Sequence, residues 1–402
     1  MLSAQPTCTL PPATGAHAPV RFKVVLGGAI GSDPHSIQTW SGSAWHLLCA
    51  MREANVLEDA IGLKLPRWTD AALKVAHFSP SRQIWRTKFY LDPACRDALT
   101  HNAARALANS PASSFLQIGA FCNLPRAVGS KIPCFSYHDG NIVEAARSGY
   151  GLKGISARRI DAAIRYEREL AHHVTAIFTS SEYLKKSFVE HFGVEDSRVF
   201  NVGAGVNFRT IPDAPSHKNY EDPEILFVGV DFERKGGPEL LAAFRAVRDV
   251  VKNARLHIVG PYRMPYGADH PGIEFHGHLN KAVEPQRRKL HQLYENASIF
   301  VLPSKYEPFG VAPLEAMLYA IPCIVTNGWA LCESVIDGLN GILVEQESVD
   351  SITAALLTLL RSPGKLAEMG QRGRERVLAN YTWPSVVERM ELAAQQMIAR
   401  NP

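Results

Sequence analysis

The sequence predicts an α/β protein built from two consecutive domains, each containing a parallel β-sheet. Short apolar runs alternate with helix-like segments along most of the 402-residue chain. This alternation stops in a polar, proline-containing stretch, residues 212–223, and then starts again. The length suits two or three domains, and a hydrophobic content of 46% is typical of a globular protein.

Composition and charge exclude several classes of protein. A net charge of +4 is too mild for a nucleic-acid-binding protein, although weak contact with an anionic membrane surface stays open. No apolar run reaches the roughly 20 residues that a membrane-spanning helix needs. The seven cysteines are scattered without a C-x2-C pair, which favours a reduced, cytoplasmic compartment and gives no metal-site spacing. Residues 1–19, rich in proline, threonine and alanine, predict a disordered tail.

The first domain, residues 20–210, is expected to open like a nucleotide-binding fold. A strand at 22–26 runs into a glycine-containing loop that includes Gly28, and a helix follows Gly42. The G-x-G-x-x-G spacing is absent, so a dinucleotide site is not predicted. A plain turn and a helix cap explain the two glycines equally well.

Further strands of this domain are predicted at 73–78, 113–118 and 133–137. The last of them runs into His138 and Asp139, a polar pair at the carboxyl end of a buried strand. Open α/β sheets bind their ligands at this end of the strands. Taken alone, however, His138 is better explained as a surface or core histidine whose hydrogen bonds are satisfied within the fold.

The second domain, residues 211–384, contains the stretch that predicts most about function. A buried strand at 298–302 leads into a tight loop, and a helix is predicted with Pro313 in its first turn and good helix sequence at 314–320. The backbone N–H groups near Gly310, Val311 and Ala312 have no partner inside the helix, so they form an anion site. Strand, loop and helix start together predict a phosphate-binding element.

Two carboxylates flank this anion site. Glu307 lies in the loop, and Glu315, eight residues later, is expected in the first helical turn. A carboxylate accepts hydrogen bonds from neighbouring hydroxyl groups, so one glutamate suits a sugar ring and the other a ribose. The alternative is that Glu315 only complements the helix dipole and that Glu307 is a solvated loop residue.

A second candidate cluster follows the strand predicted at 224–230. Arg234 and Lys235 are adjacent in a loop that starts near Gly229 and ends in two glycines. An arginine grips phosphate oxygens with two parallel bonds, and a lysine adds a compact charge. Such cations would stabilise a departing diphosphate, as preorganised donors stabilise an oxyanion. The alternative is a solvated turn.

The Glu307–Glu315 string resembles the E-x7-E motif of the family-four retaining glycosyltransferases, and the Arg234-Lys235-Gly236 loop is similar to theirs. The resemblance extends from about Phe22 to Met390. It implies the GT-B fold: two Rossmann-like domains with an interdomain cleft, and a C-terminal helix, 385–402, that crosses back to the first domain. Ala320, where a glycine is frequent, and the loop at 328–333 depart from the family pattern.

The resemblance also implies an activity and a set of site residues. A sugar would pass from a UDP- or GDP-linked donor to a hydroxyl group of a glycan, lipid or small molecule, with retention of configuration. Neither a cofactor nor a metal is expected, because cations replace the divalent ion used elsewhere. The implied catalytic residues are Glu307, Arg234, Lys235 and His138, and the implied donor-binding residues are Gly28, Gly42, Gly229, Phe309, Gly310, Val311, Ala312 and Glu315.

Two other readings of the sequence stay open. A nucleotide-sugar-binding sensor would keep the fold and lack transfer. An epimerase or hydrolase on the same architecture would need further acid–base carboxylates, which the sequence does not single out. The expected partners are a nucleotide-sugar donor and a hydroxyl acceptor that the sequence does not identify, and the oligomeric state is not predicted.

Overall fold

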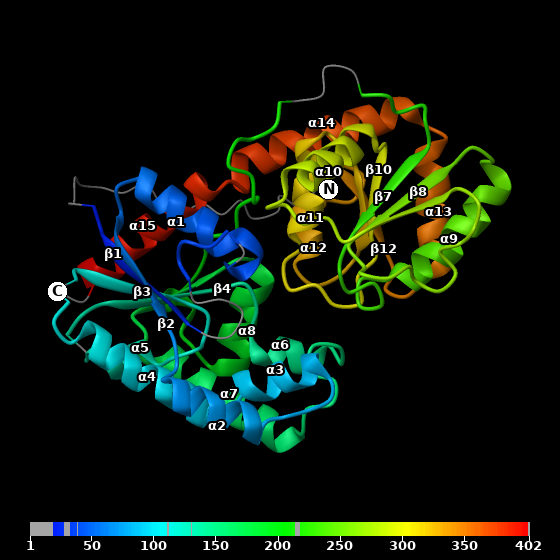
Figure 1. The fold of residues 1–402 in the computed structure, drawn as a ribbon. Helices are drawn as coiled ribbons and strands as arrows, with labels where there is room; N and C mark the ends of the chain where they lie inside the picture. The colour runs from blue at the N-terminus through cyan, green and yellow to red at the C-terminus, as the bar shows by residue number, and fades with distance from the viewer. Residues whose placement is uncertain are drawn as a thin grey trace. The chain divides into compact units, whose positions relative to one another are not determined.

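A computed structural model describes residues 19–27, 33–37, 39–110, 112–129, 131–213 and 218–400. The chain forms two compact units (Figure 1). The first contains the described residues of Met1–Gly205 and Trp383–Pro402, and the second is Val206–Thr382. The sequence placed the corresponding limits at 210/211 and 384/385. The tail expected at 1–19 lies outside the described residues apart from its last position.

The first unit is built on a six-stranded sheet in which every pair of neighbouring strands is parallel. The strand order is β2-β1-β3-β4-β5-β6, so the direction of winding reverses between β1 and β3. The strands are β1 Phe22–Gly27, β2 Leu57–Leu63, β3 Ser114–Ile118, β4 Cys134–His138, β5 Ala176–Thr179 and β6 Val199–Asn201.

Helices pack on both sides of this sheet, and the last helix of the chain, α15, packs on α1 and β5. The predicted return of the C-terminal helix to the first domain is therefore confirmed. The helices are η1 Thr39–Gly42, α1 Ser43–Glu53, α2 Arg67–Ala76, α3 Arg82–Tyr90, α4 Pro93–Leu107, α5 Leu124–Val128, α6 Ile142–Arg147, α7 Ala157–His173, α8 Glu182–Phe192, η2 Asp196–Arg198 and α15 Trp383–Arg400.

Close packing fixes the start of α15. A side chain at Gly205 would lie 2.5 Å from the Trp383 ring, so only glycine allows this approach. The Trp383 ring meets Tyr137 edge-on, with ring centroids 6.5 Å apart. Further along the helix, Arg389 donates a hydrogen bond of 2.7 Å to the carbonyl of Val202.

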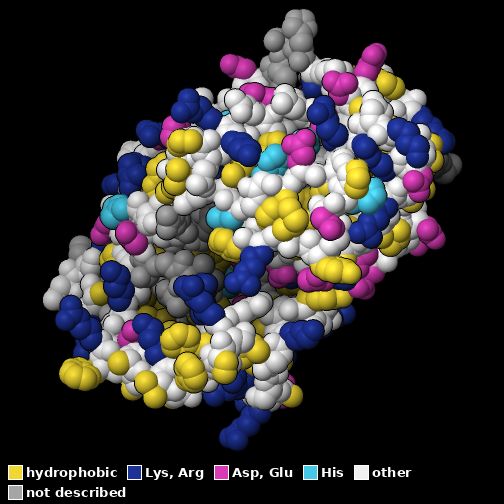
Figure 2. Space-filling view, turned by 45° about the vertical axis from the view of Figure 1, so that its right-hand side comes forward, with side chains coloured by type: hydrophobic (Ala, Val, Ile, Leu, Met, Phe, Trp, Pro, Cys, Tyr) yellow, Lys and Arg dark blue, Asp and Glu magenta, His cyan; other side chains and the backbone are white. Residues whose placement is uncertain are grey.

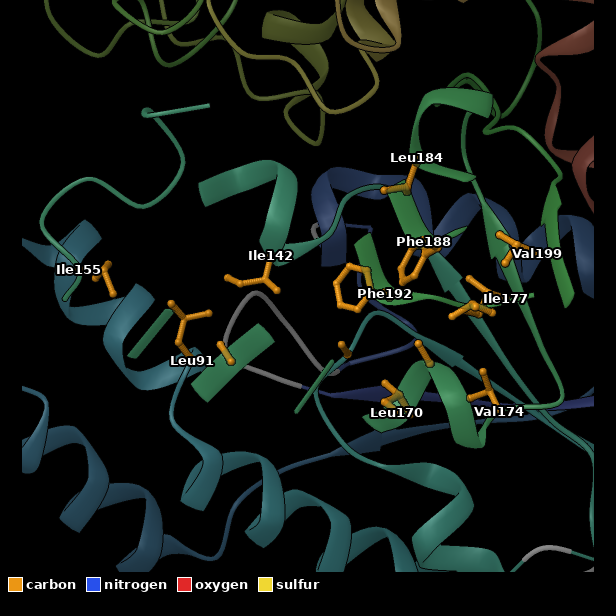
Figure 3. Close-up of a cluster of buried hydrophobic side chains, with 14 residues drawn as sticks. Leu91, Ile142, Ile155, Leu170, Val174, Ile177, Leu184, Phe188, Phe192 and Val199 are labelled. Atoms are coloured by element: carbon orange, nitrogen blue, oxygen red, sulfur yellow. The ribbon is translucent and has the colours of Figure 1, made fainter. Parts of the chain in front are cut away.

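A buried apolar cluster lies between β5 and the helices α7 and α8 (Figure 3). Leu170, Ile177, Phe188 and Phe192 belong to it, and each is at most 2% exposed. The Phe188 ring also packs against His138, with centroids 5.0 Å apart. The cluster therefore holds the carboxyl end of β4, where the predicted polar pair begins.

The strand predicted at 73–78 is wrong. This segment lies in and just after helix α2, and the strand of the region is β2, which comes earlier in the chain. Val75 and Phe78 are 79% and 68% exposed, so their apolar character marks no buried strand face. Lys74 pairs with Asp70 one helical turn before it, which is a spacing that supports a helix.

The second unit has a second six-stranded parallel sheet, in the order β12-β11-β10-β7-β8-β9. The winding reverses between the neighbours β7 and β10. Open α/β sheets place their ligands beside the carboxyl ends of the strands at such a reversal. The strands are β7 Glu224–Val228, β8 Arg255–Val259, β9 Ile273–Gly277, β10 Ile299–Leu302, β11 Cys323–Thr326 and β12 Gly341–Val344.

Figure 1 shows α9 and α13 on one side of this sheet and α10 and α11 on the other. Among the described residues, no helix is both long and apolar enough to cross a membrane. Figure 2 shows basic and acidic side chains interspersed on the visible face, in keeping with the small net charge. The helices are α9 Gly237–Val250, α10 Glu284–Asn296, α11 Val311–Leu318, α12 Leu331–Ser334, α13 Val349–Leu360 and α14 Pro363–Asn380.

We predict that Gly370→Ala destabilises the second unit. Helix α14 packs on α11, and an added Cβ at Gly370 would overlap the carbonyl oxygen of Ala320, two residues beyond the end of α11. That oxygen also accepts a hydrogen bond of 2.6 Å from Tyr220, so it is not free to move. Overpacking of this kind costs about 1–3 kcal/mol, more than the roughly 1 kcal/mol that alanine gains over glycine in a helix.

The midpoint of thermal unfolding measures this effect. Gly364→Ala is the matched control, because it lies in the same helix and its Cβ would meet nothing within 4 Å. A midpoint for Gly370→Ala as high as that of Gly364→Ala would contradict the predicted overlap.

Candidate functional site

The candidate site of the second unit lies at the reversal of its sheet. The loop after β7 carries Arg234 and Lys235, and the loop after β10 carries Glu307 and Gly310. Because β7 and β10 are parallel neighbours, both loops leave the same edge of the sheet. Residues that are about 70 positions apart in the sequence are thereby brought together.

The strongest contact between the two loops is an ion pair. Lys235 Nζ lies 2.5 Å from Glu307 Oε2, and the two side chains are only 15% and 10% exposed. The same carboxylate oxygen lies 3.8 Å from Arg234 Nη1 and accepts a hydrogen bond of 3.4 Å from Ser304 Oγ. The structure therefore brings together Arg234, Lys235 and Glu307, as the sequence analysis expected of a shared site.

Glycines allow this arrangement. A Cβ at Gly229 would overlap the Lys235 side chain, so the lysine lies directly across the glycine. Gly236 has φ 72° and its Cβ would overlap the carbonyl oxygen of Pro303, so no other residue fits there without strain. The Gly229 N–H donates a hydrogen bond of 2.8 Å to the carbonyl of Val259 and thus continues the hydrogen bonding between β7 and β8.

Arg234 is oriented by groups that the sequence analysis did not single out. Its Nε lies 3.2 Å from the carboxylate of Asp231, and its Nη1 donates a 2.5 Å hydrogen bond to the carbonyl of Tyr306. These two bonds occupy two of the five donors of the guanidinium group. Asp231 lies three residues before Arg234, at the spacing of a local turn, and this spacing was the available signal.

Helix α11 begins at Val311, so Pro313 lies in its first turn, as predicted. Gly310 has φ 93°, a left-handed conformation that turns the chain into the helix, and no side chain caps the first turn. The N–H groups of Val311 and Ala312 lie in this first turn and have no acceptor within the helix. Because the helix begins at Val311, Glu315 lies in its second turn, and the prediction that Glu315 lies in the first turn is wrong.

Glu315 is 2% exposed and is held by two partners. It forms an ion pair with Lys281 and accepts a hydrogen bond of 3.2 Å from the Tyr294 hydroxyl. Burial, followed by the charge of Glu315, raises the pKa of Tyr294 well above its usual value, so the hydroxyl stays protonated and donates. Lys281 is 44% exposed, so the Glu315 carboxylate can accept bonds from another group only if this side chain moves.

Phe309 supports the loop from beneath. Its side chain is 7% exposed and lies against Tyr381, with ring centroids 6.2 Å apart. A buried ring contributes to the position of the following glycine, Gly310, through packing. The groups of this loop that remain available to bind a ligand are the backbone of Gly310 and the N–H groups at the start of α11.

Three predicted residues belong to the first unit. His138 is the last residue of β4 and is 3% exposed, and burial lowers its pKa to about 3. The imidazole is therefore neutral at physiological pH. Gly42, with φ 96°, joins η1 to α1 at the N-cap position. Gly28 lies outside the described residues.

Comparison with known proteins identifies the family. Residues 209–376 match the family model described as glycosyl transferases group 1, and this segment covers nearly all of the second unit. The second unit belongs to the group 1 glycosyltransferases. The family resemblance drawn from the E-x7-E string and the Arg-Lys-Gly loop is thus confirmed.

Curated relatives of this chain include two mycobacterial transferases. It is 26% identical over 251 residues to a glycogen synthase of Mycobacterium tuberculosis, which covers 60% of this chain and 58% of the relative. It is 27% identical over 264 residues to the MMP alpha-(1->4)-mannosyltransferase of Mycolicibacterium hassiacum, covering 64% and 62%. The chain therefore spans about 60% of the length of these relatives.

Solved structures confirm the predicted GT-B fold of two Rossmann-like domains. The sucrose-phosphate synthase of Thermosynechococcus elongatus aligns with a TM-score of 0.68 at 17% identity, covering 94% of this chain and 100% of that one. HepE of Anabaena, solved in complex with UDP and glucose, aligns with a TM-score of 0.62 at 14% identity, covering 94% and 100%. At these identities the likeness shows the fold alone.

We predict that His138 makes the protein sensitive to acid. The imidazole has a pKa of about 3 in the folded protein, against 6.5 in a model peptide, so the unfolded chain binds its proton first. The neutral ring makes its full contribution to the free energy of unfolding above pH 6.5, and this contribution is lost as the pH falls towards 3. At pH 4 the loss is of the order of 3 kcal/mol, since one pKa unit corresponds to about 1.4 kcal/mol.

Urea denaturation at pH 7 and at pH 4 measures this loss. His138→Gln should lose less free energy of unfolding between the two pH values than the wild type, whatever its stability at pH 7. The exposed His173 supplies the control, since His173→Gln should keep the wild-type dependence. An equal loss in His138→Gln and the wild type would show that His138 is not the group responsible.

Proposed function

We propose that the protein is a retaining glycosyltransferase that uses a nucleotide-diphosphate sugar, UDP- or GDP-linked, as donor. The observation that carries the proposal is the Lys235–Glu307 ion pair beside the uncapped start of α11. Cations, a helix N-terminus and a buried carboxylate at one sheet reversal suit a ligand that is part phosphate and part sugar. The acceptor is a hydroxyl group on a glycan, a lipid or a small molecule.

In this proposal the diphosphate lies against Arg234, Lys235 and the N–H groups of Val311 and Ala312. Arginine offers parallel donors and lysine a point charge, so both neutralise the phosphate as it departs. They take the role that a divalent ion has in other transferases, and the proposed reaction therefore needs no metal or cofactor. The lysine is already fixed in place, which is how preorganised charge lowers a barrier.

The proposed sugar contacts come from carboxylates and a neutral histidine. Glu307 accepts hydrogen bonds from donor sugar hydroxyls, and Glu315 accepts those of the ribose after Lys281 moves aside. His138, neutral because of its burial, is proposed as a hydrogen-bonding group for the reacting sugar. The other proposed donor-site residues act by letting the backbone come close to the donor or by packing. They are Gly28, Gly42, Gly229, Phe309 and Gly310.

The reaction that we propose is a front-face displacement. The bond between the anomeric carbon and the phosphate oxygen breaks, and a bond from that carbon to the acceptor oxygen forms on the same face. The acceptor proton passes to the departing phosphate oxygen, so no separate base is required. A cytoplasmic setting is proposed as well, because the cysteines among the described residues form no disulfide.

We predict that Lys235→Ala lowers turnover by roughly a hundredfold or more, since it removes a charge that stabilises the departing diphosphate. The measurement is steady-state release of nucleoside diphosphate and glycosylated product. Lys252→Ala is the control, because Lys252 is a lysine of the same unit that is 77% exposed. Far-UV circular dichroism checks folding, since breaking a buried pair also costs stability.

The outcome separates the alternatives. Unchanged turnover in folded Lys235→Ala would remove this residue from the mechanism. A wild-type protein that binds a nucleotide sugar but forms no product with any acceptor would be a sensor. Release of free sugar without an acceptor would favour a hydrolase.

A further inference from the structure

Three side chains that the proposed reaction does not use meet at the edge of the second sheet. His257 lies in β8 and is paired in register with Glu274 of β9. His276 follows Glu274 by two residues, and alternate residues of a strand point to the same face. In the part of the chain that the structure describes, His257, Glu274 and His276 form a group whose ligand atoms lie within 4.8 Å of one another.

The distances among these atoms fit a metal ion. His257 Nδ1 lies 3.0 Å from His276 Nε2 and 3.5 Å from Glu274 Oε2, and the latter two atoms are 4.0 Å apart. The point equidistant from the corners of this triangle lies about 2.1 Å from each atom, which matches the length of Zn²⁺ bonds to histidine nitrogen and carboxylate oxygen. The two rings lie nearly end to end, with centroids 5.2 Å apart, so both imidazoles would turn to direct a nitrogen lone pair at an ion there.

A second carboxylate sets the tautomer of His257. Nε2 of His257 lies 2.6 Å from Glu224 Oε2. Because the carboxylate accepts, Nε2 carries the proton and the lone pair of Nδ1 points towards the other two ligand atoms. Glu224 is itself 7% exposed and is paired with Arg255. A carboxylate behind a ligating histidine is the usual support of a protein metal site.

A simple hydrogen bond between the two imidazoles explains less of the geometry. It accounts for the 3.0 Å between His257 and His276. It does not account for Glu274, whose oxygen faces both rings at 3.5 and 4.0 Å, at or beyond hydrogen-bond length. Glu274 thus converges on the two rings without a short contact to either, and a partner shared by all three side chains would account for its position.

A cavity of about 450 Å³ borders His257 and Glu274, two of the three residues of the cluster. Glu224, His257 and Glu274 line it from the sheet, and residues of α10 line it from the other side. An ion and its water ligands fit in this space, so a fourth coordination position can be filled by water. Arg255 and Lys289 also line the cavity and oppose a cation there, whereas Glu224 and Glu274 favour one.

We propose that His257, Glu274 and His276 bind one divalent transition-metal ion of the zinc type. Two imidazoles and one carboxylate suit zinc better than magnesium or calcium, which prefer oxygen ligands alone. The ion would join the edge strand β9 to β8 and stabilise the second unit. Glu224 begins β7, whereas Arg234 and Lys235 follow its carboxyl end, so this site is separate from the proposed donor site.

Zinc titration of the chelator-treated, full-length protein tests the proposal. Competition with a chromophoric chelator should show one tight equivalent in the wild type, and Co²⁺ should give the visible absorption of a nitrogen- and oxygen-ligated ion. Glu274→Gln, at an exposed position, and His276→Gln should each weaken binding at least tenfold. Glu224→Gln should weaken it by about 10–100-fold, as loss of a supporting carboxylate does.

His278→Gln is the matched control. His278 lies two residues beyond His276, but its ring packs against Tyr262, with centroids 4.6 Å apart. This variant should bind zinc as the wild type does. Zinc at 100 times its dissociation constant should raise the wild-type melting temperature by roughly 5 °C, and should not raise that of Glu274→Gln.

Two results would overturn the proposal. One is a wild-type protein without a tight zinc equivalent, which decides the matter even where a variant does not fold. The other is unchanged stoichiometry and affinity in folded Glu274→Gln and His276→Gln, which would place any bound zinc elsewhere.

Discussion

The ion pair between Lys235 and Glu307 is the contact on which the candidate site depends. It joins the loops that follow β7 and β10, the two strands at which the second sheet reverses. Both side chains are largely buried, so leaving either charge alone would cost about 3–5 kcal/mol. The surrounding sequence is fitted to this pair: a side chain at Gly229 would overlap Lys235, and one at Gly236 would overlap Pro303.

The same pair explains why the site is organised before any ligand arrives. Each charge has an assigned partner: Lys235 has Glu307, and Arg234 has Asp231 and the carbonyl of Tyr306. Groups that are already oriented need little rearrangement when charge develops on a departing phosphate. Glu315 is different, because a half-exposed Lys281 covers it and must leave before a hydroxyl group binds. In this account, donor binding therefore replaces the contact between Lys281 and Glu315, and the contacts of Lys235 and Arg234 stay as they are.

The sequence predicted the site best where the site residues directly follow a buried strand. Arg234, Lys235 and Glu307 each follow a buried strand, so the pattern of alternating elements was enough to place them at one sheet edge. Partners from other elements were missed, because Tyr294 and Lys281 become neighbours of Glu315 only when α10 packs beside α11. Segment 73–78 was misassigned because its apolar residues are exposed on a helix. The histidine cluster was missed because its ligands come from two strands, and Glu274-x-His276 was the only local signal.

A thermal-shift screen of the chelator-treated protein against UDP, GDP, ADP and their sugar conjugates tests the central claim most directly. A nucleotide at about 100 times its dissociation constant stabilises the folded state by roughly 2.7 kcal/mol. This account predicts that one base is selected in the wild type and that the shift is much smaller in Glu315→Ala, whose ribose contact is lost. No shift with any nucleotide, or an equal shift in Glu315→Ala, would contradict the placement of a nucleotide sugar at the reversal of the second sheet.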